Sequence, residues 1–199
     1  YAYKTPSEDP AEDNTQPIDG KIFLDPAVPE RNNTRNYSYG YNYQFLGNSR
    51  KRVGGAEGDW INWPVKLQDI TPASGTVMAG DNLGTAASTP AVDRQPYNPT
   101  GKGNSVDQVG NHAWSLDPPR LTAEGDFCDD NNRMVARSAV EARHGKKTNV
   151  VFCDGHVETT TPQSLGYVVN EDGTVPLLDQ GSNARFSGKG RDLDPPPIQ

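Results

Sequence analysis

The alternation of apolar and polar residues predicts one clear strand in the first third of the chain. Residues 35–48, RNYSYGYNYQFLGN, place an aromatic residue at every second position from Tyr37 to Phe45. This period of two is typical of a strand with one buried face. Gly40 in the middle of the row indicates a bulge or a closely approaching backbone. We expect these aromatic side chains to form one face of a sheet; a sugar-stacking platform is the alternative.

The strongest supersecondary signal lies in residues 143–162, RHGKKTNVVFCDGHVETTTP. Asp-Gly between two apolar-rich runs predicts a hairpin, because a type I′ turn needs two consecutive residues with positive φ. With Asp154 and Gly155 as the turn, Cys153 lies opposite His156. The pairs that follow are Phe152 with Val157, Val151 with Glu158, and Val150 with Thr159.

This register predicts one apolar face formed by Val150, Phe152 and Val157. A hairpin of this size is marginally stable alone in water. Another element must therefore cover the apolar face.

Other elements are shorter. Residues 65–70 have the spacing of a helical turn or a short strand, residues 76–79 predict a buried strand, and residues 133–143 fit a helix or a strand weakly. A further strand is expected at residues 166–169. Asp81 follows the strand at 76–79, where it can cap the loop or serve as a ligand.

Most of the remaining chain predicts irregular structure. We expect a single domain over residues 1–199, with an extended lead-in at 1–20, a long loop excursion at 84–133 and an extended tail at 180–199. The chain has 20 glycines, 17 prolines and a hydrophobic fraction of 33%. These values indicate a modest core that carries long loops.

Charge and hydropathy exclude two classes of function. The net charge of −7 opposes binding to nucleic acid, which needs a basic surface. No apolar run approaches the ~20 residues that span a bilayer, and the longest, residues 150–153, is far shorter. The chain begins at Tyr1 without a leader, so we expect it to be the soluble remainder of a processed or truncated protein.

The two cysteines, Cys128 and Cys153, predict either one disulfide or two free thiols. The Cys153–His156 pair could form a zinc site with Cys128 or His144, although no Cys-x-x-Cys or His-x-x-x-His spacing supports it. No Gly-x-Ser-x-Gly motif predicts a hydrolase. We therefore expect no enzyme.

Acidic residues offer a second kind of site. Asp126, Asp129 and Asp130 lie in the most polar part of the chain, and Asp81 could join them in a calcium site. Their spacing is not that of an EF-hand, and a solvated acidic loop is the alternative.

Four segments occur in an order that resembles one family: KIFLDPAVPE at 21–30, SYGYNYQFLG at 38–47, VKLQDITPASGTVMAGDN at 65–82, and the stretch from 143 onward. The order is similar to that of pilin-like proteins with a His-x9-Asp-Gly processing-associated domain. His144, Asp154 and Gly155 match this signature, and Asp81 matches the aspartate after the earlier strand. The resemblance covers residues 20–82 and 138–165.

The resemblance implies an α+β, pilin-like fold: a small antiparallel sheet with long irregular loops, packed on an N-terminal hydrophobic helix that this chain lacks. The implied function is a structural subunit of a pseudopilus, a type IV pilus-like filament or a secretion apparatus. Its partners would be other pilin-like subunits and, through the helix, the inner membrane, and its location would be extracytoplasmic.

His144 and Asp154 would organise the hairpin, and the helix would cover Val150, Phe152 and Val157. Asp25-Pro26 stands where the family often has Cys-Pro, so the resemblance supplies no disulfide. A cell-surface module that binds Ca²⁺ or glycans is the alternative function.

Overall fold

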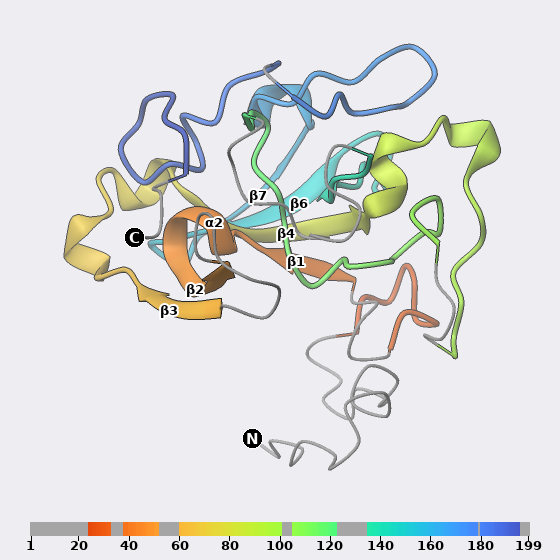
Figure 1. Ribbon diagram of the computed structural model, residues 1–199, viewed down its shortest axis with the longest axis horizontal. Coiled ribbons are helices and arrows are strands. Elements are labelled where there is room, and N and C mark those ends of the chain that lie inside the picture. Colours follow the sequence, from red (N-terminus) through yellow and green to blue (C-terminus); the bar gives the residue numbers. More distant parts are fainter. Residues whose placement is uncertain are drawn as a thin grey trace.

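The computed structural model describes residues 24–32, 38–51, 60–100, 105–122, 135–178 and 180–195. Within these residues the main feature is a five-stranded antiparallel sheet with the order β1-β4-β6-β7, in which β5 also pairs with β4 (Figure 1). The strands are β1 (Tyr39–Tyr41), β4 (Val77–Gly84), β5 (Ala139–Val140), β6 (Thr148–Phe152) and β7 (Val157–Thr160). The predicted small antiparallel sheet with long irregular connections is confirmed.

The other elements are short. A separate hairpin contains β2 (Gly47–Lys51) and β3 (Trp60–Pro64). The one α-helix in the described residues is α2 (Tyr43–Leu46), and the 3₁₀ helices are η2 (Leu67–Asp69), η3 (Ala73–Gly75), η4 (Thr85–Ser88), η5 (Ala91–Asp93) and η7 (Gln163–Leu165). No helix in the described part of the chain has the length and apolarity needed to cross a membrane.

The central strand β4 organises the sheet, since it pairs with β1, β5 and β6. Glycines allow the close approach of these neighbours. A Cβ on Gly80 would lie only 2.7 Å from Cγ1 of Val150, and a Cβ on Gly40 would clash with the Asn82 amide. That Cβ would also lie 2.9 Å from the carbonyl oxygen of Ala113, so the predicted close backbone neighbour at Gly40 is confirmed. No bulge is present there, because the β1–β4 register is continuous.

The hairpin from β6 to β7 is present, but its predicted register is wrong by one residue. Val151 lies opposite Val157 and Val150 lies opposite Glu158. The turn contains three residues, because the amide of Phe152 bonds the carbonyl of His156 and the amide of Gly155 bonds the carbonyl of Phe152. Of the three turn residues, only Gly155 has a positive φ, +92°. This is the type I turn with a left-handed glycine that three-residue hairpins use.

The shift changes which side chains share a face. Val150 and Phe152 are 1% and 0% exposed, whereas Val157 is 68% exposed. A slip of one residue moves every side chain of one strand to the other face of the sheet. The predicted face of Val150, Phe152 and Val157 is therefore wrong: Val157 projects from the opposite side, with Val151 and Ala79.

The buried side of the hairpin is covered by this chain's own C-terminal part. Val150 and Phe152 belong to one core cluster with Leu165, Tyr167 and Phe186. Residues 180–195 were expected to be extended, but they fold back in turns that bury Phe186 completely. The blue segments of Figure 1 follow this return. Phe152 also stacks on the ring of His156, with 4.4 Å between the centroids.

The aromatic row does not form one strand. β1 ends at Tyr41, and Tyr43 begins α2, while Tyr37 lies outside the described residues. Asn42 separates the two elements: it is fully buried, and its side-chain amide donates to the carbonyls of Val77 and Phe186. These two bonds fix a change of direction that the period of two does not predict.

Four weaker expectations have mixed outcomes. Residues 65–70 contain the 3₁₀ turn η2, and the strand at 76–79 is confirmed but extends to Gly84 as β4. Within 133–143 the structure has the two-residue strand β5. The strand predicted at 166–169 is wrong: Gly166 adopts a φ of +103°, and the Tyr167 hydroxyl donates to the carbonyl of Asp117.

The described residues between 84 and 122 are irregular apart from η4 and η5. Leu116 and Leu121 are fully buried and attach this segment to the core. Arg137 is also fully buried, and its guanidinium donates to the carbonyls of Pro118, Pro119 and Pro176. The buried Arg137 guanidinium thus connects the loop at Pro118 and Pro119 with the loop at Pro176, neither of which forms strand hydrogen bonds there.

The corrected register can be tested by truncating one valine and one phenylalanine of the hairpin. Phe152→Ala removes a fully buried ring and will lower the free energy of unfolding by about 3–5 kcal/mol. Val157→Ala trims a side chain that is 68% exposed and will change it by less than about 0.5 kcal/mol. Urea denaturation of both variants gives the comparison. Equal losses would support the two-residue turn instead.

Candidate functional site

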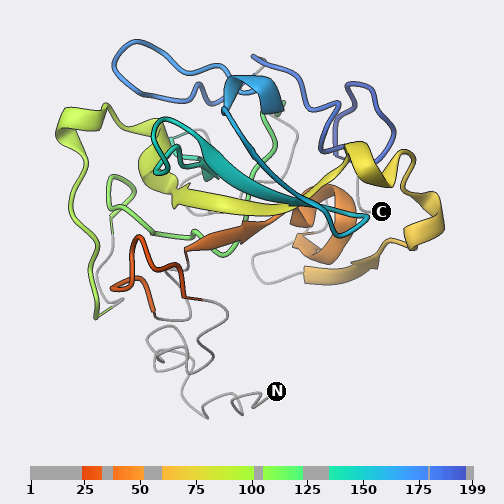
Figure 2. The same cartoon turned by 180° about the vertical axis from the view of Figure 1, so that it is seen from behind.

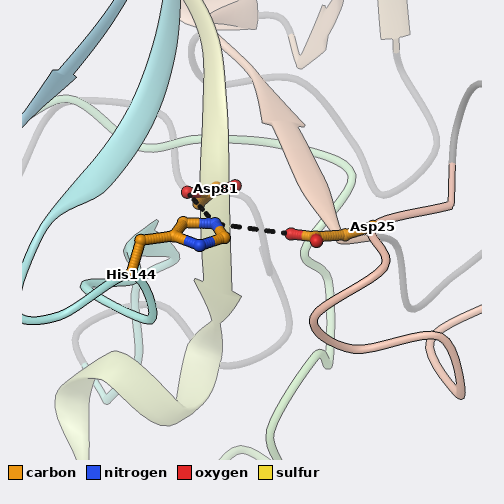
Figure 3. A group of neighbouring side chains, drawn as sticks. All are labelled: Asp25, Asp81 and His144. Atoms are coloured by element: carbon orange, nitrogen blue, oxygen red, sulfur yellow. Dashed lines mark ion pairs between the residues drawn. The ribbon is translucent and has the colours of Figure 1, made fainter.

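Three side chains from distant parts of the sequence converge at one edge of β4 (Figure 3). Nε2 of His144 lies 3.2 Å from Oδ2 of Asp81 and 3.8 Å from Oδ2 of Asp25. One ligand atom from each residue lies within 4.8 Å of the others. The structure therefore brings the predicted residues His144 and Asp81 together and adds Asp25.

Local structure fixes each of these side chains. Asp81 lies on β4, and its Oδ2 accepts the backbone N–H of Asn149 on β6 at 2.6 Å. His144 begins a tight turn in which the amides and carbonyls of His144 and Lys147 bond each other. Gly145 and Lys146 between them have φ values of +61° and +65°, as a type I′ turn requires. The turn expected at Asp154-Gly155 is thus found one strand earlier, where it positions the histidine.

Asp25 is held by a turn of its own. Its Oδ1 accepts the amide N–H of Ala27 at 2.8 Å, and its carbonyl accepts the amide of Val28 at 3.0 Å. A side chain that bonds its own backbone two residues on forms an Asx turn. This turn orients Oδ2 of Asp25 toward His144.

Three further charged residues complete what we call the charge cluster, defined as Asp25, Arg31, Asp81, Glu141, Arg143 and His144. Arg143 pairs with Asp25 at 2.8 Å and with Glu141 at 3.0 Å, and Arg31 pairs with Glu141 at 2.5 Å. The side chains of Asp25, Arg31 and Arg143 are at most 6% exposed. Buried charges need such partners, because the loss of hydration costs several kcal/mol per ion.

The charge cluster perturbs its own acids. Burial raises the pKa of the Asp81 carboxyl above its ordinary value, and Asp25 raises it further; the Asn149 amide, Arg143 and His144 lower it. Burial also raises the pKa of the neighbouring Tyr39, with Asp25 and Asp81 acting in the same direction. Desolvation is therefore the dominant electrostatic effect at this site.

Two atoms at the centre have no hydrogen-bond partner in the structure. They are Oδ1 of Asp81, on a residue that is fully buried, and Nε2 of His144. The contact of Nε2 with Asp81 is close, but the oxygen lies outside the direction of a ring N–H. Buried polar atoms without partners are rare and indicate a missing ligand, water or ion.

His144 and Asp154 do not contact each other, contrary to the expected support of the hairpin. They lie at opposite ends of β6, whose five residues span about 17 Å. Asp154 instead pairs with His156, with 2.6 Å between Oδ1 and Nδ1. The side-chain hydrogen bond from His156 lowers the pKa of Asp154, which is exposed. Gly155 supplies the positive φ of the turn.

The zinc site considered for Cys153 and His156, which no ligand spacing supported, is not formed by the described residues. Among these residues the only group of three potential metal ligands is Asp25, Asp81 and His144. Cys153 carries a free thiol, which contradicts a disulfide from this residue. Burial, and to a smaller extent Asp154, raise the pKa of this thiol to about 11. Cys128 lies outside the described residues.

The calcium candidates have only one member in the described structure. Asp126, Asp129 and Asp130 lie outside the described residues, so their calcium site stays a prediction. Asp81 is fully buried next to an imidazole.

Four members of the charge cluster were not predicted: Asp25, Arg31, Glu141 and Arg143. Glu141 and Arg143 are two residues apart, and Arg143 is adjacent to His144. Alternation along an extended segment is therefore the one sequence signal that places Glu141 and Arg143 on the same side. Asp25 and Arg31 carry no such signal, because their contacts cross more than 100 residues of sequence.

Comparison of the chain with protein-family models, with curated proteins and with solved structures found no significant match.

The electrostatics predict opposite pH dependences for two aspartates. A raised pKa in the folded state means that Asp81 favours folding at acid pH, and this contribution is lost as the pH rises through its folded pKa. The free energy of unfolding of the wild type will therefore fall relative to Asp81→Asn as the pH rises from about 3 to 7. Asp154 has a lowered pKa, so relative to Asp154→Asn the wild type will gain stability as the pH rises through that pKa. Urea titrations across this range measure both, and parallel curves would contradict the account.

The thiol of Cys153 offers a chemical test of burial. A pKa of about 11 predicts that alkylation by iodoacetamide at pH 8 is about 100-fold slower than for an unperturbed cysteine, because the thiolate is the nucleophile. The measurement uses Cys128→Ser protein, which leaves Cys153 as the one thiol. The same protein in urea is the control. Equal rates in the folded and unfolded states would show that Cys153 is accessible and ionised normally.

Proposed function

We propose that this chain is the globular domain of a pseudopilin-like structural subunit, which assembles with other pilin-like subunits through an N-terminal hydrophobic helix. The signature His144-x9-Asp154-Gly155 supports the proposal from the sequence. The observation that carries it in the structure is an open apolar face of the main sheet.

The open face is defined by Tyr41, Ala79, Val151 and Val157, which lie opposite one another across β1, β4, β6 and β7. Directly opposed residues of an antiparallel pair project to the same side. None of the four is buried, and Val157 is 68% exposed. In Figure 2, β6 and β7 lie on the near side of the sheet.

One face of the sheet is filled by this chain's own core, and part of the other face is free to pack against a helix. The face with Val150 and Phe152 is already filled by core residues of this chain. A helix is about 10–12 Å wide, and strands lie about 4.8 Å apart, so one helix can cover two or three of these strands. The hydrophobic helix therefore fits the open face, and the expectation that it covers Phe152 is replaced by one that it covers Val151 and Val157.

The remaining parts of the proposal follow from the same assembly. A subunit held by an N-terminal hydrophobic helix would be anchored in the inner membrane as a precursor and would expose this domain outside the cytoplasm. Its role would be structural. The alternative of a calcium- or glycan-binding module rests on Asp81, on the three aspartates beyond the described residues and on the tyrosine row.

The open face can be tested by placing a charge on it in the protein that carries the helix. Val157→Asp will abolish assembly into filaments, because an unpaired carboxylate would be buried under the helix. The isolated domain will change in stability by less than about 0.5 kcal/mol, since Val157 is exposed. Electron microscopy of sheared filaments and urea denaturation are the two readouts.

The matched control is Val92→Asp, which places the same charge on a valine that is 92% exposed and lies in η5. This variant is expected to assemble normally. Normal assembly of Val157→Asp would contradict packing on the open face. The coding sequence upstream of Tyr1 tests the family directly: the proposal requires a leader junction followed by a hydrophobic helix.

A further inference from the structure

We infer that Asp25, Asp81 and His144 form a binding site for a divalent transition-metal ion such as Zn²⁺. The inference does not depend on the proposed filament role, since it rests only on the geometry of the charge cluster. It differs from the calcium site expected from the sequence in two of its three ligands and in the class of metal.

The ligand spacing suits a small ion. Ligand atoms that are each about 2.1 Å from a tetrahedral ion lie about 3.4 Å apart. Nε2 of His144 lies 3.2 Å from Asp81 Oδ2 and 3.8 Å from Asp25 Oδ2. An ion on the axis of the imidazole nitrogen holds its other ligands off that axis, at angles of about 109°. This explains why the Asp81 oxygen is close to Nε2 yet lies outside hydrogen-bonding direction.

Unsatisfied atoms provide the second, independent observation. Asp81 is fully buried, and its Oδ1 has no hydrogen-bond partner. Nε2 of His144 is likewise without one. A proton shared between these groups would need a directed hydrogen bond, whereas a metal ion needs only lone pairs at suitable distances.

Hydrogen bonds hold the two carboxylates in place, as they do around the ligands of a bound metal ion. Oδ2 of Asp81 accepts the amide of Asn149, Oδ1 of Asp25 accepts the amide of Ala27, and Oδ2 of Asp25 accepts Arg143. Each carboxylate oxygen has a second lone pair that remains for the ion. Metal-binding carboxylates are typically held by hydrogen bonds of this kind, which fix their orientation.

The donor set selects the class of metal. Two carboxylates and an imidazole suit Zn²⁺ and its transition-metal neighbours, while Ca²⁺ takes six to eight oxygen ligands. The His144 side chain is 30% exposed but its Nε2 is buried, so the ion would lie on the buried side of the imidazole ring. A bound ion would tie the turn at Asp25 to β4 and to the turn before β6.

The test uses the full chain without a polyhistidine tag, stripped with EDTA and dialysed. Isothermal titration with ZnCl₂ is expected to show one ion per chain. At 100 times the dissociation constant, the melting temperature will rise by about 5 to 10 °C, because the ion binds only the folded state. Asp81→Asn and His144→Gln will each weaken binding at least 10-fold. Asp81→Asn keeps the acceptor for the Asn149 amide, and its melting curve without metal shows whether it folds.

His156→Gln is the matched control, because His156 also contacts an aspartate, Asp154, at 2.6 Å but belongs to no three-residue grouping in the described chain. It is expected to bind like the wild type. If a variant does not fold, ¹⁵N NMR of the wild-type imidazoles decides, since Zn²⁺ must shift Nε2 of His144 and leave His156 in place. Absent binding, binding that His144→Gln retains, or a shift confined to His112 or His156 would overturn the inference.

Discussion

The burial of Asp81 on the central strand is the constraint on which much of this structure depends. β4 joins β1, β5 and β6, and Asp81 is fully buried at the point where these pairings meet. A buried carboxylate is costly unless cations and donors surround it. The amide of Asn149 and the side chains of Arg143 and His144 reduce this cost, although burial still raises the pKa of Asp81. Each comes from the segment between β5 and the middle of β6, so the constraint fixes how that segment returns to the sheet.

The charge cluster also connects parts of the chain that share no strand pairing. Asp25 and Arg31 contact Arg143 and Glu141 across more than 100 residues of sequence. The guanidinium of Arg143 in addition donates to the carbonyls of Ser38 and Asn82. One edge of the sheet is thus closed by charge pairs, while its inner face is closed by Phe152, Tyr167 and Phe186. The other face carries the charge cluster at Asp81 and, two residues along β4, the open face at Ala79, Val151 and Val157, where a packing partner is proposed.

The sequence predicts elements here better than it predicts their detail. The hairpin at Asp154-Gly155 was predicted because Asp-Gly is a turn signal, but the same dipeptide fits a two-residue turn and a three-residue turn with one left-handed glycine. The choice between them decides whether Val157 is in the core. The tyrosine row failed for a different reason, since the buried amide of Asn42 binds two distant carbonyls and ends the strand.

The candidate site was likewise predicted only in part. His144 and Asp81 were identified from the sequence, but their mutual contact was not, and His144 was assigned to Asp154 at the wrong end of β6. Asp25 and Arg31 could not be found, because a local pattern carries no information on contacts that only the complete fold creates. Arg137 was missed as a core residue for a related reason: hydropathy places arginine on the surface, and only the three proline carbonyls around it explain its burial.

The most direct test of the central claim is a double-mutant cycle between Asp81 and His144, measured by urea denaturation in EDTA at pH 6. If His144 stabilises the buried carboxylate, the coupling free energy from Asp81→Asn, His144→Gln and the double variant will exceed about 1 kcal/mol. Effects that add to within about 0.5 kcal/mol would show that the two residues are independent and would contradict the account.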